Sequence, residues 1–370
     1  PVSVTGIPQL TLNVGGTDRI ATYAGGTGTS LVFKYTIQAN DIDSNGIAIA
    51  ANSLALNGGT INDPAGNAAT LTHASVADNT SYLVDTKAPT VSTVAITSAT
   101  GVQNSTLNAG DVVSVTVMMS EVVTVTGTPK LTLNVGGTNR IATYASGTAT
   151  SLVFKYTIQA NDTDNNGIAI AANSLALNGG TINDLAGNAA TLSHAAVADN
   201  ADYKVDTKAP NAPGIAATSY AFPGALTGTA EALASVSVFQ GTTELGKATA
   251  DVSGMWSYTF TSANQTTLGP SGSVTLTAKA TDAAGNASAS STNAVITRSS
   301  TSSVDRLTGI GSNDTFTLGS LANSKLLAFD TIIGYVATQA IDSPSTTTES
   351  FIKSSVGDLT VNTIADLSSK

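Results

Sequence analysis

The sequence predicts an all-β protein in which β-sandwiches follow one another along the chain, with a small domain at the C-terminal end. Three observations support this fold class: alternating apolar residues, a long internal duplication, and a composition suited to strands and turns. Aromatic residues make up only 5% and charged residues 11% of the chain, whereas 34 glycines are available for turns. No capped amphipathic helix is found. The expected domains are residues 1–85, 86–207, 208–300 and 301–370.

The internal duplication covers the first half of the chain. Residues 1–85 align with residues 122–206 at an offset of 121 (122 − 1). Of the 85 aligned positions 15 differ, which leaves 85 − 15 = 70 identical positions. This identity indicates a tandem duplication of a unit of about 121 residues. Whatever the unit does is therefore done more than once.

Each copy is predicted to consist of short strands. In "LVFKYTIQA", the side chains of Leu31, Phe33, Tyr35 and Ile37 fall on one face, and the residues between them fall on the other. The strings "LTLNV" and "IATYA" alternate in the same way and flank "GGT", which predicts a β-hairpin turn. The stretch "IAIAANSLALNGGT" is interpreted as strand and turn.

The second copy carries a leader that the first copy lacks. Residues 88–121 predict two strands, at 91–97 and 112–119, around the turn "NAGD". A sandwich without two of its strands exposes an unpaired edge and an apolar face. Two interpretations stay open: further strands precede residue 1, or another chain supplies them by β-augmentation. In the second case, copies of the chain join head to tail, because such heterologous contacts propagate.

A third sandwich is predicted for residues 208–300, after the linker "VDTKAPNAPG". Its turn signals are spaced as in a seven-stranded sandwich. Trp256, the only tryptophan, is interpreted as a core anchor between two sheets rather than a ligand-stacking residue. Residues 301–370 follow a Ser/Thr-rich stretch and are expected to form the small C-terminal domain.

Several strings resemble those of known bacterial families. "VDTKAPTV", "LNVGGTNRIATYASG" and "DLAGNAA" resemble the repeats of giant bacterial surface proteins, including cyanobacterial ones associated with motility. "LTGTAE", "GMWSYTF" and "ATDAAGNAS" resemble bacterial Ig-like domains of repetitive adhesins, and "GIGSNDTFTLG" with "AIDSP" is similar to calcium-dependent, secretion-linked C-terminal segments. The resemblance implies extracellular tandem Ig-like β-sandwiches at the bacterial cell surface, stiffened by calcium at domain junctions.

Charge and composition exclude several classes of partner. The formal net charge is 15 − 25 = −10, so the chain is not expected to bind nucleic acid or anionic lipid through its own field. The absence of cysteine excludes disulfides and thiolate zinc sites. No apolar run approaches the roughly 20 residues of a membrane span, and no signal peptide is found. The excess of carboxylates favours cation binding.

The first candidate calcium site is a repeated acidic loop. "DIDSNG" and "DTDNNG" place Asp or Asn at alternating positions before a glycine, like the opening of an EF-hand loop. The closing Glu of an EF-hand is absent, because position twelve is Asn52 or Asn173. The alternative is a polar turn capped by its own side chains. The candidate ligands are Asp41, Asp43, Asn45, Asp162, Asp164 and Asn166.

The second candidate calcium site lies at the domain junctions. The loops "NDPAGN", "NDLAGN" and "TDAAGN" each precede a predicted domain end, and "VDTKAP" supplies an Asp at each linker. The resemblance to adhesins implies that the loop Asp and the linker Asp approach one another around calcium. Binding there stiffens the linker. The candidate ligands are Asp63, Asp184 and Asp282 in the loops and Asp85 and Asp206 in the linkers.

No enzymatic site is predicted. His73 and His194 are the only histidines, and they occupy equivalent repeat positions without an evident nucleophile and orienting acid. The predicted function is therefore a structural one: the chain extends or assembles at the bacterial surface as a filament, surface layer or adhesin stalk. The alternative is an adhesive module that recognises glycans or neighbouring cells. An exposed aromatic cluster, which could include Tyr23 and Tyr144, distinguishes this alternative.

Overall fold

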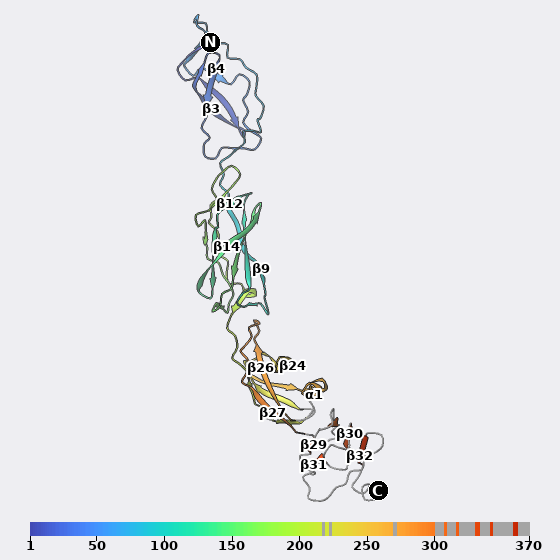
Figure 1. The fold of residues 1–370 in the computed structure, drawn as a ribbon. Helices are drawn as coiled ribbons and strands as arrows, with labels where there is room; N and C mark the ends of the chain where they lie inside the picture. The colour runs from blue at the N-terminus through green and yellow to red at the C-terminus, as the bar shows by residue number, and fades with distance from the viewer. Residues whose placement is uncertain are drawn as a thin grey trace. The chain divides into compact units, whose positions relative to one another are not determined.

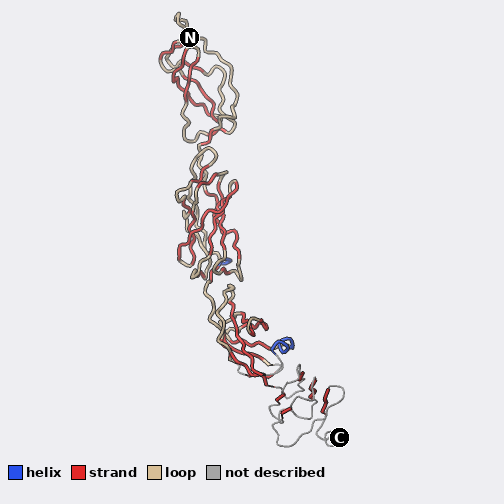
Figure 2. The backbone as a smooth tube through the Cα atoms, in the orientation of Figure 1, coloured by secondary structure: helices blue, strands red, loops and turns tan. Residues whose placement is uncertain are grey.

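The computed structural model describes residues 1–216, 219–221, 224–268 and 272–299, together with five short strands in the last part of the chain. Those strands are β28 (Leu307–Thr308), β29 (Phe316–Thr317), β30 (Asp330–Ile333), β31 (Ile341–Asp342) and β32 (Asp358–Val361). The rest of the predicted C-terminal domain lies outside the described residues. Most of the residues that carry the resemblance to secretion-linked C-terminal segments also lie outside them. The described chain is built almost entirely of strands and loops, which confirms the all-β, Ig-like sandwich class (Figures 1 and 2).

The chain divides into two compact units. The first contains residues 1–101 and 109–205, and the second contains residues 102–108 and 206–370. Both copies of the duplicated sequence, except residue 206, lie in the first unit. Below, repeat 1 means residues 1–85, and repeat 2 means residues 86–207, which are the second copy with its leader. Residues 102–108 and 206–207 of repeat 2 belong to the second unit. The residue bounds of the four expected domains stay a prediction.

Repeat 2 is built on a six-stranded sheet with the strand order β17-β13-β14-β15-β11-β9. The predicted "GGT" hairpin joins β13 to β14, and the predicted leader strands are β9 and β11. Alternate residues of β11 and β15 are buried, because they face the core of the sandwich. The strands are β9 (Val91–Thr100), β11 (Val112–Met119), β13 (Lys130–Val135), β14 (Thr138–Thr148), β15 (Ser151–Thr157) and β17 (Leu175–Ala176).

Repeat 1 has only the first four strands of that sheet, in the order β4-β3-β2-β6. No described strand covers the β4 edge, where β11 and β9 lie in repeat 2 (Figure 2). The strands are β2 (Gln9–Val14), β3 (Thr17–Thr27), β4 (Ser30–Lys34) and β6 (Leu54–Ala55).

The second face of each repeat consists mainly of loops and very short strands. The stretch interpreted as strand and turn at 168–181 forms a two-residue strand, β17, and isolated bridges such as Ile170–Val197. Asn173 and Asn178 adopt positive φ angles of 57° and 51°, which end the extended conformation. The short elements are β1 (Ser3–Thr5), β5 (Ile42–Asp43), β7 (Thr60–Asn62), β8 (Val84–Asp85), β12 (Thr124–Thr126), β16 (Thr163–Asp164), β18 (Thr181–Asn183) and the 3₁₀ turn Ala201–Tyr203.

The second unit contains the third sandwich. Its sheets have the strand orders β20-β22-β25 and β21-β27-β26-β23-β24. Trp256 is 2% exposed and packs in the core between them, as predicted. The strands are β20 (Gly214–Ile215), β21 (Ser219–Ala221), β22 (Ala225–Thr229), β23 (Ser235–Gln240), β24 (Thr243–Thr249), β25 (Met255–Thr259), β26 (Gly272–Thr281) and β27 (Ala294–Ser299); β10 (Thr106–Leu107) also belongs to this unit, and β19 (Lys204–Asp206) ends in it.

One helix, α1 (Ser262–Leu268), was not expected from the sequence. It spans seven residues, too few to show an amphipathic period. The buried Asn264 fixes it, because its side chain accepts from the Thr261 backbone and from the Tyr258 hydroxyl and donates to the Leu245 carbonyl at 2.8 Å. The helix therefore depends on tertiary contacts rather than on its local sequence.

Candidate metal centre

Three carboxylates meet where repeat 1 is joined to repeat 2. Asp85 is the last residue of β8, Glu121 lies two residues after β11, and Asp184 lies in the loop after β18. One oxygen from each of these side chains lies within 4.8 Å of the other two. They are called the junction cluster below. Among the described residues, no other three acidic or histidine side chains converge in this way.

The loop "NDLAGN" holds Asp184 in a fixed orientation. The Asn188 backbone amide donates to Asp184 Oδ1 at 2.8 Å, and the Asn188 side-chain amide donates to Oδ2 at 2.8 Å. Asp184 is 4% exposed. Burial alone raises its pKa, but the hydrogen bonds from Asn188 and the loop amides outweigh this effect and hold the pKa below its ordinary value. The carboxylate is therefore ionised at neutral pH.

The junction cluster carries uncompensated negative charge. The ion pairs of the described residues are Arg19–Asp41, Arg140–Asp162 and Lys247–Glu244, and none of them reaches the cluster. Three carboxylates this close repel one another unless a cation lies between them. Hard oxygen ligands from carboxylates and carbonyls are those that Ca²⁺ prefers. The residues present therefore fit a calcium ion in chemistry and charge.

The same loop also anchors the linker. The Asn188 side chain donates to the Asp85 carbonyl at 2.9 Å, and in the second unit the Asn286 side chain donates to the Asp206 carbonyl at the same distance. Asp282 accepts from Asn286 as Asp184 accepts from Asn188. In repeat 1, Asn67 binds Asp63 in the same way. The predicted loop and linker residues therefore meet at both linkers, although only the first brings three carboxylates together in the described chain.

Replacing Asn188 with alanine is expected to lower the free energy of unfolding of the first unit by about 1–2 kcal/mol, because two side-chain hydrogen bonds are lost. Urea denaturation measures this change. The matched control is Asn67→Ala, which removes a side-chain bond to Asp63 alone at an exposed position and should cost less. Equal losses in the two variants would contradict a linker-anchoring role.

The other predicted ligands, those of the acidic loops, bind protein donors. Asp162 accepts from Arg140, from the Tyr156 hydroxyl and from the Gln159 amide, and Asp164 accepts from the Gly136 and Gly167 amides at 2.7 and 2.8 Å. The residues Asp41, Asp43 and Asn45 of repeat 1 repeat this pattern. Asn166 and Asn45 donate their side-chain amides to Asp199 and Asp78. The Asn166 and Gly167 amides belong to the same loop as Asp164, as in a polar turn, whereas Arg140, Tyr156 and Gly136 reach the loop from elsewhere in repeat 2.

The two histidines have structural contacts. The Ser174 amide donates to His194 Nε2 at 2.9 Å, so Nδ1 carries the proton and donates to the Ala195 carbonyl at 2.8 Å. His73 makes the corresponding contacts with Ser53 and Ala74. No carboxylate orients either ring among the described contacts. Both histidines therefore join neighbouring loops.

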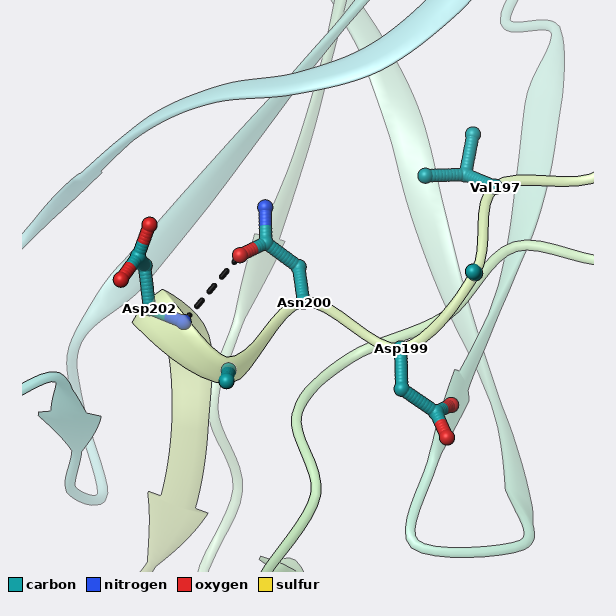
Figure 3. Close-up of a pocket in the computed structure, with 6 residues that line it drawn as sticks. Val197, Asp199, Asn200 and Asp202 are labelled. Carbon is teal, nitrogen blue, oxygen red and sulfur yellow. Dashed lines mark hydrogen bonds between the residues drawn. The ribbon is translucent and has the colours of Figure 1, made fainter.

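A shallow hollow of about 420 Å³ lies over residues 197–202. Figure 3 shows that Asp199 and Asp202 point away from each other, while the Asn200 side chain accepts from the Asp202 amide at 3.1 Å. The six lining residues are consecutive. The hollow offers no converging groups that would hold a ligand.

Comparisons with known proteins give a family match within the second unit and similar solved structures that cover more of the chain. Residues 216–297 match the model of the bacterial Ig-like domain family, which covers the third predicted sandwich. A search of curated proteins gave no match. Among solved structures, a 1.5-MDa bacterial ice-binding adhesin is 17% identical, with 79% of this chain and 84% of that chain covered and a TM-score of 0.31.

Two further solved structures are similar to this chain. The fibronectin(III)-like modules of Clostridium thermocellum CbhA are 13% identical, with 56% of this chain and 95% of that chain covered and a TM-score of 0.27. A tetra-tandem repeat from the extending region of a large adhesion protein is 19% identical, with 80% and 66% covered and a TM-score of 0.22. At these TM-scores the similarities carry no functional argument.

Sequence reasoning named Asp85 and Asp184 but missed Glu121. Glu121 closes the leader, and the first copy has no aligned counterpart because the alignment begins at the next residue. The sequence signal that could have identified Glu121 is its position, because it is the residue directly before the second copy. In the part of the chain that the structure describes, no helix is long and apolar enough to cross a membrane.

Proposed function

We propose that the chain is a structural, extracellular repeat protein that extends or assembles at the bacterial surface, and that calcium at the junction cluster stiffens the link between repeats 1 and 2. The observation that carries this proposal is the cluster itself, at the only linker between the repeats. A cation there ties Asp85 of the linker to two side chains of repeat 2. The bacterial Ig-like match at residues 216–297 supports the surface class.

Calcium is expected to raise the melting temperature of the first unit by roughly 3–5 °C at 1 mM, because a site with a Kd of about 0.1 mM adds about 1.4 kcal/mol. Differential scanning calorimetry with calcium or chelator measures this shift. Small-angle scattering should show a narrower distribution of lengths with calcium.

The variant Asp184→Asn should lose most of the calcium shift, since it keeps the shape of the residue but removes one charge. Asp63→Asn is the matched control in repeat 1, because Asp63 is not part of the carboxylate cluster that the described residues form, and it should keep the shift. Unchanged melting of the unmodified chain on adding calcium would refute the metal site.

Head-to-tail assembly through repeat 1 is the second part of the proposal. The half-buried Leu31 and Phe33 of β4 support it, because another chain can add strands to such an edge. Intact mass and N-terminal sequencing of native material test it, together with sedimentation at increasing concentration. A native product that carries its own strands before residue 1 makes donation unnecessary. We also propose that the repeats are related to those of cyanobacterial surface proteins, and that the C-terminal segment is related to secretion-linked ones.

The alternative, an adhesive module for glycans or neighbouring cells, has weaker support. Tyr23 and Tyr144 pack edge-on against Phe33 and Phe154 at 5.9 Å instead of forming an exposed platform. Tyr82, at 64% exposed, is the sole strongly exposed aromatic side chain among those the structure describes. A glycan array gives the direct test. Enzymatic activity is not part of the proposal, because the histidines are engaged by loop backbone.

A further inference from the structure

The chain enters and leaves one sheet of the third sandwich through two strands that lie side by side. β21 is the first strand of the five-stranded sheet in chain order and β27 is the last, and the two pair in parallel. The paired residues are Ser219 with Thr297, Tyr220 with Arg298 and Ala221 with Ser299. Because the strands are parallel, the incoming chain reaches β21 at one end of the pair, and the outgoing chain leaves β27 at the other end.

Tension along the chain therefore loads this pair along its strands. A pull on the incoming chain draws β21 backwards, while a pull on the outgoing chain draws β27 forwards. The evenly spaced backbone hydrogen bonds of the parallel pair then share the load and must break together. If two strands are instead pulled apart from the same end, their bonds break one after another. Bonds that break together resist a larger force than the same bonds broken singly.

β21 is the strand on which this resistance depends. β27 is also held by β26, with which it forms five further residue pairs. β21 lies at the edge of the sheet, and its three described pairs are all with β27. A pull from the incoming side reaches β20 first, which holds only two pairs with β22 in the other sheet. Once β20 has detached, the β21–β27 pair carries the load.

We propose that the parallel β21–β27 pair is a mechanical clamp that keeps the third sandwich folded when the chain is under tension. Tension reaches the clamp from both sides, because repeat 2 precedes it in the sequence and residues 301–370 follow it. The proposal rests on the structural role at the bacterial surface, where an extended chain bears load, but it is independent of the calcium site. Repeat 2 is built differently, since its first strand, β9, and its last strand, β19, belong to different sheets.

Single-molecule stretching of the full 370-residue chain, held at its two ends, tests the clamp. Residues 214–299 of the third sandwich number 299 − 214 + 1 = 86 and release about 300 Å of chain on unfolding. In repeat 2, residues 91–206 number 206 − 91 + 1 = 116 and release about 400 Å. The two unfolding events therefore differ in length, and the event of repeat 2 is the internal reference in each recording.

The direction of pulling provides the first comparison. Because the chain has no cysteine, the substitutions Ala216→Cys and Asn293→Cys, at two exposed residues, allow handles to be attached there alone. Each position precedes its strand, so both handles pull at the same end of the pair and separate β21 from β27 one bond at a time. We expect the third sandwich to yield at less than about half the force needed when the chain is held at its ends. Equal forces in the two geometries would overturn the proposal.

Two proline variants test the hydrogen bonds themselves. Successive residues of a strand direct their N–H groups to opposite sides, so one of Tyr220 and Ala221 faces β27 and the other faces away from the sheet edge. Since proline lacks the N–H, one of Tyr220→Pro and Ala221→Pro should lower the unfolding force by at least about a quarter. The other is its matched control and should leave the force unchanged. The effect of Tyr220→Pro is measured against Tyr220→Ala, which loses the same side chain but keeps the N–H. Equal effects of the two prolines, or none in either, would contradict the clamp.

The fluorescence of Trp256 shows whether each variant is folded. It is the only tryptophan and lies in the core of the third sandwich, so its emission reports on this domain. The proline variant with the lower force should shift the urea midpoint by less than about 1 M, because one edge hydrogen bond adds little to equilibrium stability. If a proline variant does not fold, the comparison of pulling directions decides. Forces in calcium and in chelator should agree, so failure of the calcium shift and failure of the clamp are separate outcomes.

Discussion

Replacing Gly136 with alanine is expected to lower the free energy of unfolding of the first unit by about 3 kcal/mol or more. Gly136 has a φ of +55°, and a Cβ there would lie 1.8 Å from the Thr163 carbonyl oxygen. That backbone cannot move away freely, because the Gly136 amide donates to Asp164 Oδ2 at 2.7 Å. The added methyl group therefore separates the hairpin from the acidic loop. Urea denaturation monitored by circular dichroism measures the loss.

The neighbouring glycine provides the matched control. Gly137 also has a positive φ, +83°, but a Cβ there would meet nothing within 4 Å. Gly137→Ala should therefore cost only the conformational strain, about 1 kcal/mol. If both substitutions cost the same, the close approach of the acidic loop to the hairpin is not what holds this side of repeat 2.

The strands were predictable wherever one face is buried along a regular strand. The alternation in "LVFKYTIQA" and in residues 112–119 predicts the buried faces of β15 and β11, because period two is a local property of the sequence. The "GGT" hairpin follows from turn chemistry at a single point. The loop-rich second face was less predictable, since asparagines in the left-handed region interrupt it and long-range hydrogen bonds fix it.

The candidate metal site was also only partly predictable from local sequence patterns. Asp85 and Asp184 could be selected from recurring loop and linker strings, but their approach to Glu121 depends on how β8, β11 and β18 end near one another. The acidic loops were selected because Asp and Asn alternate before a glycine, as at the opening of a calcium-binding loop. Their oxygens accept from amides and from residues such as Arg140 and Tyr156, whose proximity no local pattern reveals. Calcium binding stays a prediction at both places.

Replacing Asp162 with alanine is the second change expected to have a large effect, about 3 kcal/mol. Asp162 is 2% exposed and accepts from Arg140 and from the buried Tyr156 hydroxyl. Burial, followed by the hydrogen bond and charge of Asp162, raises the pKa of Tyr156 to about 12, so the hydroxyl stays protonated as the donor. Without the carboxylate, a buried donor and a partly buried guanidinium lose their acceptor. Urea denaturation of the variant measures the cost.

The same substitution in repeat 1, Asp41→Ala, is the matched control and should cost less. Its donors, Arg19 and Tyr35, are the same residue types, but Tyr35 is only half-buried and can bind water once the carboxylate is gone. Hydrogen exchange separates the two copies, because residue 28 is glycine whereas residue 149 is alanine. Equal costs of the two substitutions would mean that the burial of the tyrosine hydroxyl does not set the cost of removing its acceptor.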